Sequence, residues 1–190
     1  MRVVISAVDD MPTPLQDQAR TIRDQAWPPH PDKPDNATDP ALDPLSMLLV
    51  DNQGVVVATL TILRKHIQHA GRPWYAAGLS AVATRKDRRG QGHGHELVVA
   101  ARAAMVEMGL DLGNFTCDRL QRGFYEQAGW EELPGAVLIG GTREDPLPSD
   151  QPGFDKVTLA AFFSPSAMAH RSAFTNTHIA LYSGTVDRLW

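Results

Sequence analysis

Arginine and glycine residues are concentrated in the segment Arg88-Arg89-Gly90-Gln91-Gly92-His93-Gly94, which follows a β-rich run ending at Thr84 and precedes an amphipathic run. Strand, glycine loop and helix in this order can bind phosphate, because N–H groups at a helix start lack intrahelical acceptors and the dipole is positive there. Guanidinium groups suit phosphate oxygens, so Arg88 and Arg89 are candidate contacts. The absence of Gly-Lys-Ser/Thr excludes a nucleoside triphosphate loop, and the glycine spacing is not the dinucleotide fingerprint. We predict a phosphate-bearing ligand at this loop, with His93 either a further contact or a surface imidazole.

The loop and a second segment resemble a known family. Residues Arg89 to Gly94 match the Arg/Gln-x-x-Gly-x-Gly/Ala loop of the GCN5-related N-acetyltransferases (GNAT), in which the loop holds the pyrophosphate of acetyl-CoA. The segment Phe124-Tyr125-Glu126-Gln127-Ala128-Gly129-Trp130 is similar to the family's second landmark, a tyrosine on the short helix after the fifth strand. The resemblance implies an α/β GNAT fold in one domain over residues 1–190. It implies a mixed, mostly antiparallel central sheet flanked by helices, with splayed fourth and fifth strands.

The resemblance also implies a reaction and roles for single residues. Acetyl transfer to a primary amine needs a deprotonated nucleophile, a positioned thioester, oxyanion stabilisation and a proton for the leaving thiolate. Acetyl-CoA would be the cosubstrate, paired through its pantetheine with backbone groups near Val82 and Thr84, and Tyr125 would protonate the sulfur. From the residues alone, Tyr125 beside Phe124 is equally well a core side chain with its hydroxyl at the rim. Transfer would be direct, so Cys117 is not expected to act as a nucleophile.

A narrower resemblance concerns the acceptor side. The segments Val55–Gln91 and Thr116–Trp130 and the terminal Trp190 look like those of the aminoglycoside 2'-N-acetyltransferases, so the favoured acceptor is a cationic aminosugar. The resemblance implies that the carboxylate of Trp190 is the first candidate for the base and Asp187 the second. It further implies acceptor contacts from Ser80, Thr116, Asp150 and Trp190. Asp35 is a further candidate, because it lies in an acidic loop that could border the cleft and attract a polycation.

Each acceptor-side assignment has an alternative. Ser80 stands where that subfamily carries a strand glutamate acting as base through water, so either the base or the acceptor differs here. Trp190 could be packed for burial alone, and Asp187, Asp35 and Asp150 could be solvated surface charges. A peptide, a polyamine or another small amine is the alternative acceptor. A CoA-binding module that has lost turnover is the alternative of another functional class.

Hydrophobic patterns predict the elements that must position these residues. Strands are expected at Val3–Val8, Met47–Asp51, Val55–Leu63 (continuing to about Gln68) and Trp74–Thr84, with an Asn52-Gln53-Gly54 turn that makes a hairpin. A helix is expected from about Pro14 to Trp27. Leu97, Val98, Ala101, Ala104, Met105 and Met108 recur at helical spacing and predict an amphipathic helix that ends before Gly109.

The C-terminal half is expected to alternate strands, loops and one short helix. We expect strands at Leu110–Cys117, from Trp130, and at Val157–Phe163, and a loop at Arg143–Gly153. Asp118 is expected to cap a short helix on which Leu120, Phe124 and Ala128 share a face. The apolar end Thr185–Trp190 is expected to pack back onto the domain.

Composition bounds the remaining function classes. The chain has 190 residues, 18 Lys and Arg, 22 Asp and Glu and a formal net charge of −4, which fits one soluble domain and argues against a general nucleic-acid binder. A single cysteine allows no intrachain disulfide and no cysteine-based zinc site. Neither His66 with His69 nor His93 with His95 has a carboxylate arranged beside it, so we expect no metal. No membrane anchor or signal peptide is visible, so we expect a cytoplasmic protein, and the family resemblance leaves room for a homodimer.

Overall fold

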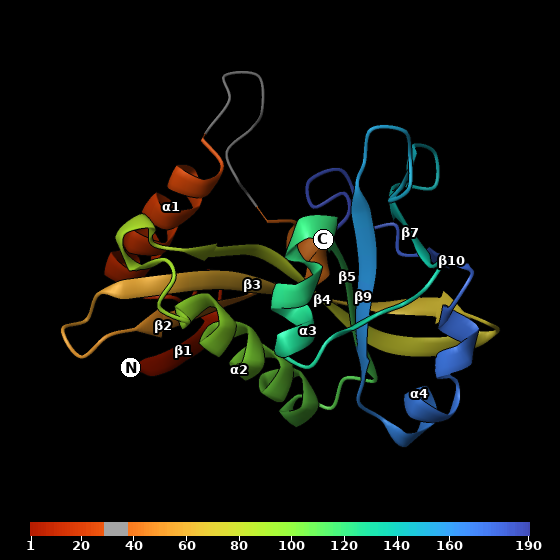
Figure 1. The fold of residues 1–190 in the computed structure, drawn as a ribbon, viewed down its shortest axis with the longest axis horizontal. Coiled ribbons are helices and arrows are strands. Elements are labelled where there is room, and N and C mark those ends of the chain that lie inside the picture. Colours follow the sequence, from red (N-terminus) through yellow and green to blue (C-terminus); the bar gives the residue numbers. More distant parts are fainter. Residues whose placement is uncertain (29–37) are drawn as a thin grey trace.

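A central seven-stranded sheet organises the computed structural model, which describes residues 1–28 and 38–190 (Figure 1). Its strand order is β1-β2-β3-β4-β5-β9-β6. The strands of this sheet are β1 (Arg2–Ala7), β2 (Leu45–Val50), β3 (Val56–His69), β4 (Arg72–Thr84), β5 (Leu112–Asp118), β6 (Glu131–Glu132) and β9 (Lys156–Phe162). The helices are α1 (Thr13–Ala26), α2 (His93–Glu107), α3 (Arg122–Gln127) and α4 (Pro165–Ala169).

The sheet is mixed and mostly antiparallel, as predicted. β1 to β4 form an antiparallel meander, and β5 pairs antiparallel with β9. β4 and β5 are parallel and pair only through Ala76 with Leu112 and Ala77 with Gly113. Since β4 continues to Thr84, the two strands diverge beyond this point, which confirms the splayed fourth and fifth strands.

A bulge marks the place where β4 leaves its partner. Thr59 and Thr61 of β3 face Ala83 and Ser80 of β4, so β4 carries one more residue than β3 in this stretch. Ala81, inside the stretch, has a left-handed φ of 51°. An extra residue in one strand interrupts the ladder and bends the strand locally. The bulge therefore leaves backbone of β4 outside the regular hydrogen-bond ladder at the opening between β4 and β5.

Helices α1 and α2 cover opposite faces of the sheet, because β2 alternates its side chains between them. Leu48 and Val50 pack in a cluster with Ala19 and Ile22 of α1. Met47 and Leu49 belong to the larger cluster that contains Leu97, Val98, Ala101 and Met105 of α2. Four residues predicted for the apolar face of α2 are therefore buried as expected. Figure 1 shows α2 and α3 side by side, and Phe124 of α3 lies close to Gly94 at the start of α2.

A second, three-stranded sheet in the order β10-β7-β8 holds the C-terminal tail. It comprises β7 (Val137–Gly141), β8 (Pro146–Pro148) and β10 (His178–Ala180). Backbone N–H groups of Leu181, Tyr182 and Gly184 donate to carbonyls of β7, and Gly141 N–H donates to the Arg188 carbonyl. The tail thus follows β7 to the end of the chain, and Trp190 is buried, which confirms that the C-terminal end packs back onto the domain.

Three local predictions were wrong. Pro146–Pro148 is a strand inside the expected loop, because pairing with β7 satisfies its backbone despite its prolines. Leu120 is 98% exposed and does not share the buried face with Ala128, since a short 3₁₀ turn, Arg119–Gln121, precedes α3 and turns it outward. Asp118 makes no capping bond, because its carboxylate accepts a hydrogen bond from Lys156 at 3.0 Å.

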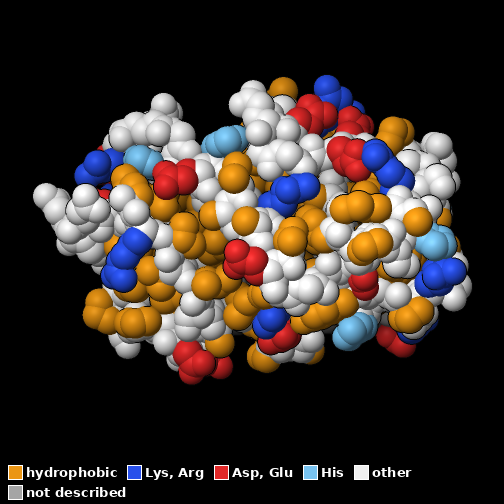
Figure 2. Space-filling model, turned by 90° about the horizontal axis from the view of Figure 1, so that it is seen from below, with side chains coloured by type: hydrophobic (Ala, Val, Ile, Leu, Met, Phe, Trp, Pro, Cys, Tyr) orange, Lys and Arg blue, Asp and Glu red, His pale blue; other side chains and the backbone are white. Residues whose placement is uncertain are grey.

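Apolar side chains also reach the surface around the edge strand β1. Met1, Val3 and Ile5 are exposed, as are Val99 and Val106 of α2. Figure 2 shows hydrophobic side chains spread over the half of the molecule that contains β1 and α2, interspersed with single charged groups. No helix in the described part of the chain is long and apolar enough to span a membrane.

Candidate functional site

A cleft of about 350 Å³ opens where β4 and β5 diverge. It unites side chains from β4, β5, α3 and the C-terminal tail with Trp27 at the end of α1. Its walls are formed by Trp27, Leu79, Ser80, Ala81, Val82, Thr116, Cys117, Asp118, Gln121, Tyr125, Lys156, Asp187, Arg188, Leu189 and Trp190. Six residues predicted for the site lie in this one cleft: Ser80, Val82, Thr116, Tyr125, Asp187 and Trp190.

Trp190 reaches the cleft because β4 has a glycine beneath it. A Cβ atom added to Gly78 would lie 2.6 Å from indole atoms of Trp190, so only glycine lets the ring rest on the strand. Trp190 is 6% exposed and belongs to the main core cluster. Trp190 therefore packs in the core and also lines the cleft. A glycine inside a predicted strand often signals such a close approach, and Gly78 is the sequence signal for this contact.

Asp187 is held by polar groups from two other segments. Its Oδ2 accepts a hydrogen bond from the Asp39 backbone N–H at 3.0 Å, and Ser80 lines the cleft beside it. Burial raises the pKa of Asp187, and the negative charge of Asp39 acts in the same direction, while the Asp39 N–H and the Ser80 hydroxyl act against it. No Lys or Arg within the described residues forms an ion pair with Asp187. A half-buried carboxylate with a raised pKa is suited to accept a proton.

Tyr125 lies in the same cleft and stays protonated over the physiological range. Its ring packs edge-on against Phe115 and Phe124, with centroid distances of 4.9 Å to each. Burial raises the pKa of the Tyr125 hydroxyl, and nearby Cys117 and Asp118 raise it further. A phenol of this kind can donate a proton but does not ionise readily. Tyr125 thus packs in the core and also lines the cleft. The core interpretation and the cleft interpretation drawn from the sequence therefore do not exclude each other.

Cys117 is a poor nucleophile in this setting. Burial raises the pKa of its thiol to about 11, and the neighbouring Asp118 raises it as well. The thiolate is the reactive form of cysteine, so little of it exists at neutral pH. The surroundings of Cys117 therefore favour direct transfer over a covalent acetyl-cysteine.

The glycine loop leads into α2 as predicted. Gly90 and Gly92 have φ values of +74° and +82°, and Gly92 is the residue from which α2 begins. A Cβ atom at either glycine would meet no protein atom within 4 Å, so the space in front of this helix start is open. The imidazole Nε2 of His93 is buried without a hydrogen-bond partner within the described residues. An open helix N-terminus of this kind favours a bound anion.

Gly94 has a packing role. A Cβ atom there would lie 2.8 Å from Thr84 Oγ1 and 3.5 Å from the Phe124 ring. Glycine at this position lets the start of α2 pack against the end of β4 and against α3. The loop is thereby fixed beside the helix that carries Tyr125.

Two predicted phosphate contacts make protein contacts in this structure. Arg89 Nε donates to the Thr84 carbonyl at 3.2 Å, and Arg88 is 4.0 Å from Asp51. Backbone hydrogen bonds from Val55 and Gln53 lower the pKa of Asp51, with help from the charge of Arg88. Both arginines remain partly or fully exposed beside the loop.

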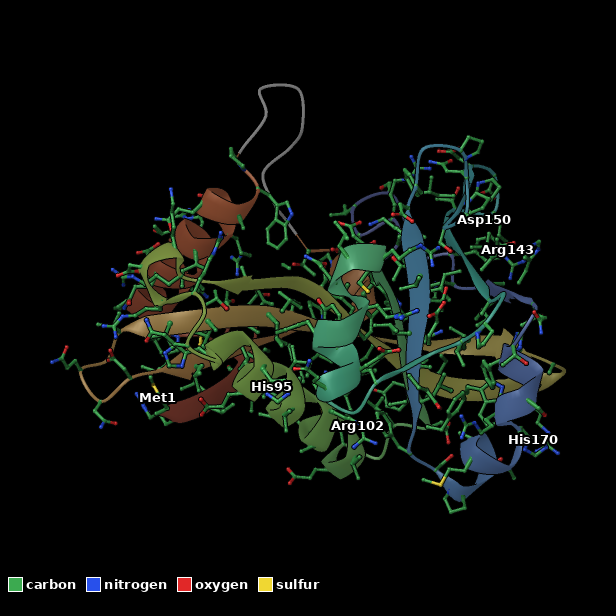
Figure 3. The ribbon with its side chains drawn as sticks, viewed as in Figure 1. Met1, His95, Arg102, Arg143, Asp150 and His170 are labelled. Carbon is green, nitrogen blue, oxygen red and sulfur yellow. The ribbon has the colours of Figure 1, made fainter. Side chains whose placement is uncertain are left out.

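Other predicted acidic contacts lie elsewhere. Asp35 falls outside the described residues. Asp150 is exposed on the segment between β8 and β9, and Figure 3 shows it far from α3. Several loop acids are in ion pairs: Asp43 with Arg64, Asp145 with Arg188, and Asp155 with Arg119.

Among the cleft residues that sequence reasoning did not predict are Trp27, Gln121, Lys156 and Arg188. Trp27 has a weak signal, an aromatic residue directly before a proline-rich segment. The others reach the cleft only through tertiary folding, and Lys156 is paired there with Asp118 at 3.0 Å. Within residues 1–28 and 38–190, no three His, Cys, Asp or Glu side chains cluster as metal ligands would.

Comparison with known proteins agrees with this geometry. The family model described as "Acetyltransferase (GNAT) domain" matches residues 14–133, which is more than half of the chain. No curated protein matches the chain in sequence. Among solved structures, the GNAT family N-acetyltransferase YhbS from Escherichia coli, in complex with CoA, has a TM-score of 0.63 at 14% identity, covering 96% of this chain and 91% of its own. An aminoglycoside 6'-N-acetyltransferase complexed with coenzyme A has a TM-score of 0.57 at 16% identity, covering 85% and 98%. An acyl-CoA N-acyltransferase from Pseudomonas aeruginosa has a TM-score of 0.55 at 16% identity, covering 84% and 97%.

Proposed function

Because the chain belongs to the GNAT acetyltransferase family, we propose that it moves the acetyl group of acetyl-CoA directly onto a primary amine bound in the cleft between β4 and β5. The observation that carries this proposal is the meeting of Asp187, Tyr125 and the bulged backbone of β4 in one cleft. These groups are a proton acceptor, a proton donor and a set of backbone groups outside the strand ladder. Acetyl-CoA supplies the activated thioester.

The chain would hold acetyl-CoA at two places. The start of α2, from Gly90 to His93, offers unpaired N–H groups to the pyrophosphate, with Arg88 and Arg89 beside it. The backbone of Val82 and Thr84 would pair with the pantetheine arm along the free edge of β4. An N–H group of this bulged stretch would polarise the thioester carbonyl, as in other preorganised oxyanion sites.

Two side chains of the cleft would take part in proton transfer. Asp187 would accept the proton of the acceptor ammonium, because its raised pKa makes its carboxylate a better base than an exposed carboxylate. Tyr125 would donate its proton to the departing thiolate and would be reprotonated from solvent. The carboxylate of Trp190 remains the alternative base, and its indole would form one wall of the acceptor site.

For the acceptor, we propose a cationic aminosugar of the aminoglycoside kind. Asp187, Ser80 and Thr116 offer polar contacts for its amine and hydroxyl groups, and the indoles of Trp27 and Trp190 offer apolar faces for a sugar ring. A peptide amine or a polyamine is the alternative acceptor. A cytoplasmic location and homodimer formation also remain proposals.

One experiment separates catalysis from mere coenzyme binding. Thiol release from acetyl-CoA is measured with aminoglycosides that carry a 2'-amine, with close relatives that carry a hydroxyl there, and with simple aminosugars, peptides and polyamines. The proposal expects release only with free primary amines and the acetylated amine as product. Tight acetyl-CoA binding without release across the whole panel would instead support a non-catalytic CoA-binding module.

A further inference from the structure

A row of three hydroxyl side chains crosses the sheet on the face that α1 covers. Ser46 of β2 pairs with Thr61 of β3, and Thr61 pairs with Ser80 of β4. Directly paired residues on neighbouring strands point to the same face, with Cβ atoms about 5 Å apart. Ser46 and Thr61 are buried, at 7% and 5% exposed, on a face whose other buried members are largely apolar. We call Ser46, Thr61 and Ser80 the hydroxyl row.

The hydroxyl row joins two cavities. Ser80 lines the cleft that also contains Asp187 and Tyr125. Ser46 and Thr61 line a second cavity of about 200 Å³, whose remaining walls are Val8, Gln16, Asp17, Ala19, Arg20, Arg23 and Thr38. Since Thr61 and Ser80 are direct neighbours, the floors of the two cavities adjoin. The pair of Thr61 and Ser80 thus marks the step from the floor of one cavity to the floor of the other.

The two ends of this floor carry opposite charge. Asp187 stands at the Ser80 end, where both residues line the cleft. Arg20 and Arg23 of α1 stand at the other end, where Asp17 pairs with Arg20 at 2.8 Å. Arg23 is half-buried, and its burial together with the nearby charge of Arg20 lowers its pKa. A ligand anion near Arg23 would offset both effects.

The spacing of the strands sets the length of a suitable ligand. Ser80 and Ser46 lie two strand intervals apart, which is about 10 Å. A molecule of that length could present an amine to Asp187 and a negative group to Arg20 and Arg23 while its polar middle lies along Thr61.

We propose that the second cavity binds the far end of the acceptor, and that the acceptor carries a carboxylate or phosphate about 10 Å from the amine that is acetylated. This inference rests on the proposed acetyl transfer to a primary amine in the cleft, and it favours an amine with an anionic end over the cationic aminosugar as the acceptor. Arg23 is the specificity-determining residue of this subsite, and Thr61 positions the middle of the acceptor.

The test compares acceptors that differ only at the far end. The probes are 8-aminooctanoate, whose extended chain matches the span, its neutral amide, and 1,8-diaminooctane; an aminoalkyl phosphate of the same length distinguishes phosphate from carboxylate. We expect kcat/KM for the better anionic probe to exceed those for the neutral and dicationic probes by about tenfold or more, the range of one charge-assisted hydrogen bond. In the variant R23Q the preference should fall to about twofold or less through a raised KM, with kcat unchanged.

Two further variants and a binding measurement distinguish failure of the subsite from failure of the proposed function. R171Q changes an arginine that is paired with Glu131 on the opposite side of the domain and should keep the preference. T61V replaces the hydroxyl by a methyl group of similar size and should raise KM for the anionic probes. If no amine is acetylated, the proposed function fails, and calorimetric binding of 8-aminooctanoate to the wild type and R23Q decides the subsite by itself. Equal affinity or equal kcat/KM for anionic, neutral and dicationic probes overturns the inference.

Discussion

Replacing Asp187 by asparagine tests the chemistry of the cleft most sharply, because the amide keeps the shape of the side chain and loses its basicity. The amide oxygen can still accept the hydrogen bond that the Asp39 N–H donates to Oδ2 in the wild type. The variant therefore changes proton acceptance while leaving the acceptor cleft largely in place.

The expected loss follows from the acceptor amine itself. An amine whose pKa lies about two units above the assay pH is neutral in roughly one molecule in a hundred, equivalent to about 2.7 kcal/mol. D187N can use only this neutral fraction, and loss of a general base typically costs about 10²-fold to 10⁴-fold, so kcat/KM near neutral pH should fall by about 100-fold or more. Its remaining rate should rise about tenfold per pH unit up to the amine pKa.

The wild type should show a different pH dependence. Burial raises the pKa of Asp187 above its ordinary value of 3.8, so activity should fall as the pH drops through that raised pKa and the carboxylate takes up a proton. D187N should lack this acid limb. The folded state binds this proton more tightly than the unfolded chain, so ionised Asp187 subtracts from stability at neutral pH, and D187N should not lower the melting temperature there.

Steady-state kinetics from mildly acidic to alkaline pH, with one amine acceptor, provide the assay. D155N is the matched control, because Asp155 is an exposed acid paired with Arg119 at 2.8 Å outside the cleft, and it should behave as the wild type. A D187N enzyme with wild-type kcat/KM and an unchanged acid limb would refute Asp187 as the base and return the role to the Trp190 carboxylate or to water.

Three other changes test separate parts of the site. Tyr125→Phe should lower kcat about 10²-fold to 10⁴-fold with KM for acetyl-CoA nearly constant, and an unchanged kcat in steady-state assays would remove Tyr125 from the proton pathway. Gly78→Ala places a Cβ atom 2.6 Å from the Trp190 indole, so urea unfolding should show a loss of about 1–3 kcal/mol and the acceptor KM should rise. Gly123→Ala, where a Cβ would meet nothing within 4 Å, is its control, and equal behaviour of the two variants would argue against the contact. Cys117→Ser should keep its turnover because the thiol pKa is raised to about 11, and a trapped acetyl-cysteine in the wild type would contradict this expectation.

The sequence predicted the elements best where one physical signal dominated. The apolar spacing of Leu97, Val98, Ala101 and Met105 identified α2, and these residues are the buried side of that helix. The β4 to α2 loop was recognisable because Gly90 and Gly92 adopt φ values that other residues rarely take. These signals are local, so they can be read without knowing the fold.

The remaining features depend on contacts between distant parts of the chain. Asp187 and Asp39 are 148 residues apart, and only the tail's path along β7 brings them together. The hydroxyl row depends on strand register, which the sequence alone does not specify. The strand at Pro146–Pro148 was missed because prolines normally indicate loops, whereas here a short edge strand accommodates them.

The most direct test of the central claim is thiol release from acetyl-CoA by the purified chain, with a panel of primary amines and with Tyr125→Phe and D187N beside the wild type. Amine-dependent release that yields the N-acetylated amine, and that both variants impair while still binding acetyl-CoA, is the predicted result. Binding of acetyl-CoA by all three proteins with no release above the amine-free background for any acceptor would contradict acetyl transfer at this cleft.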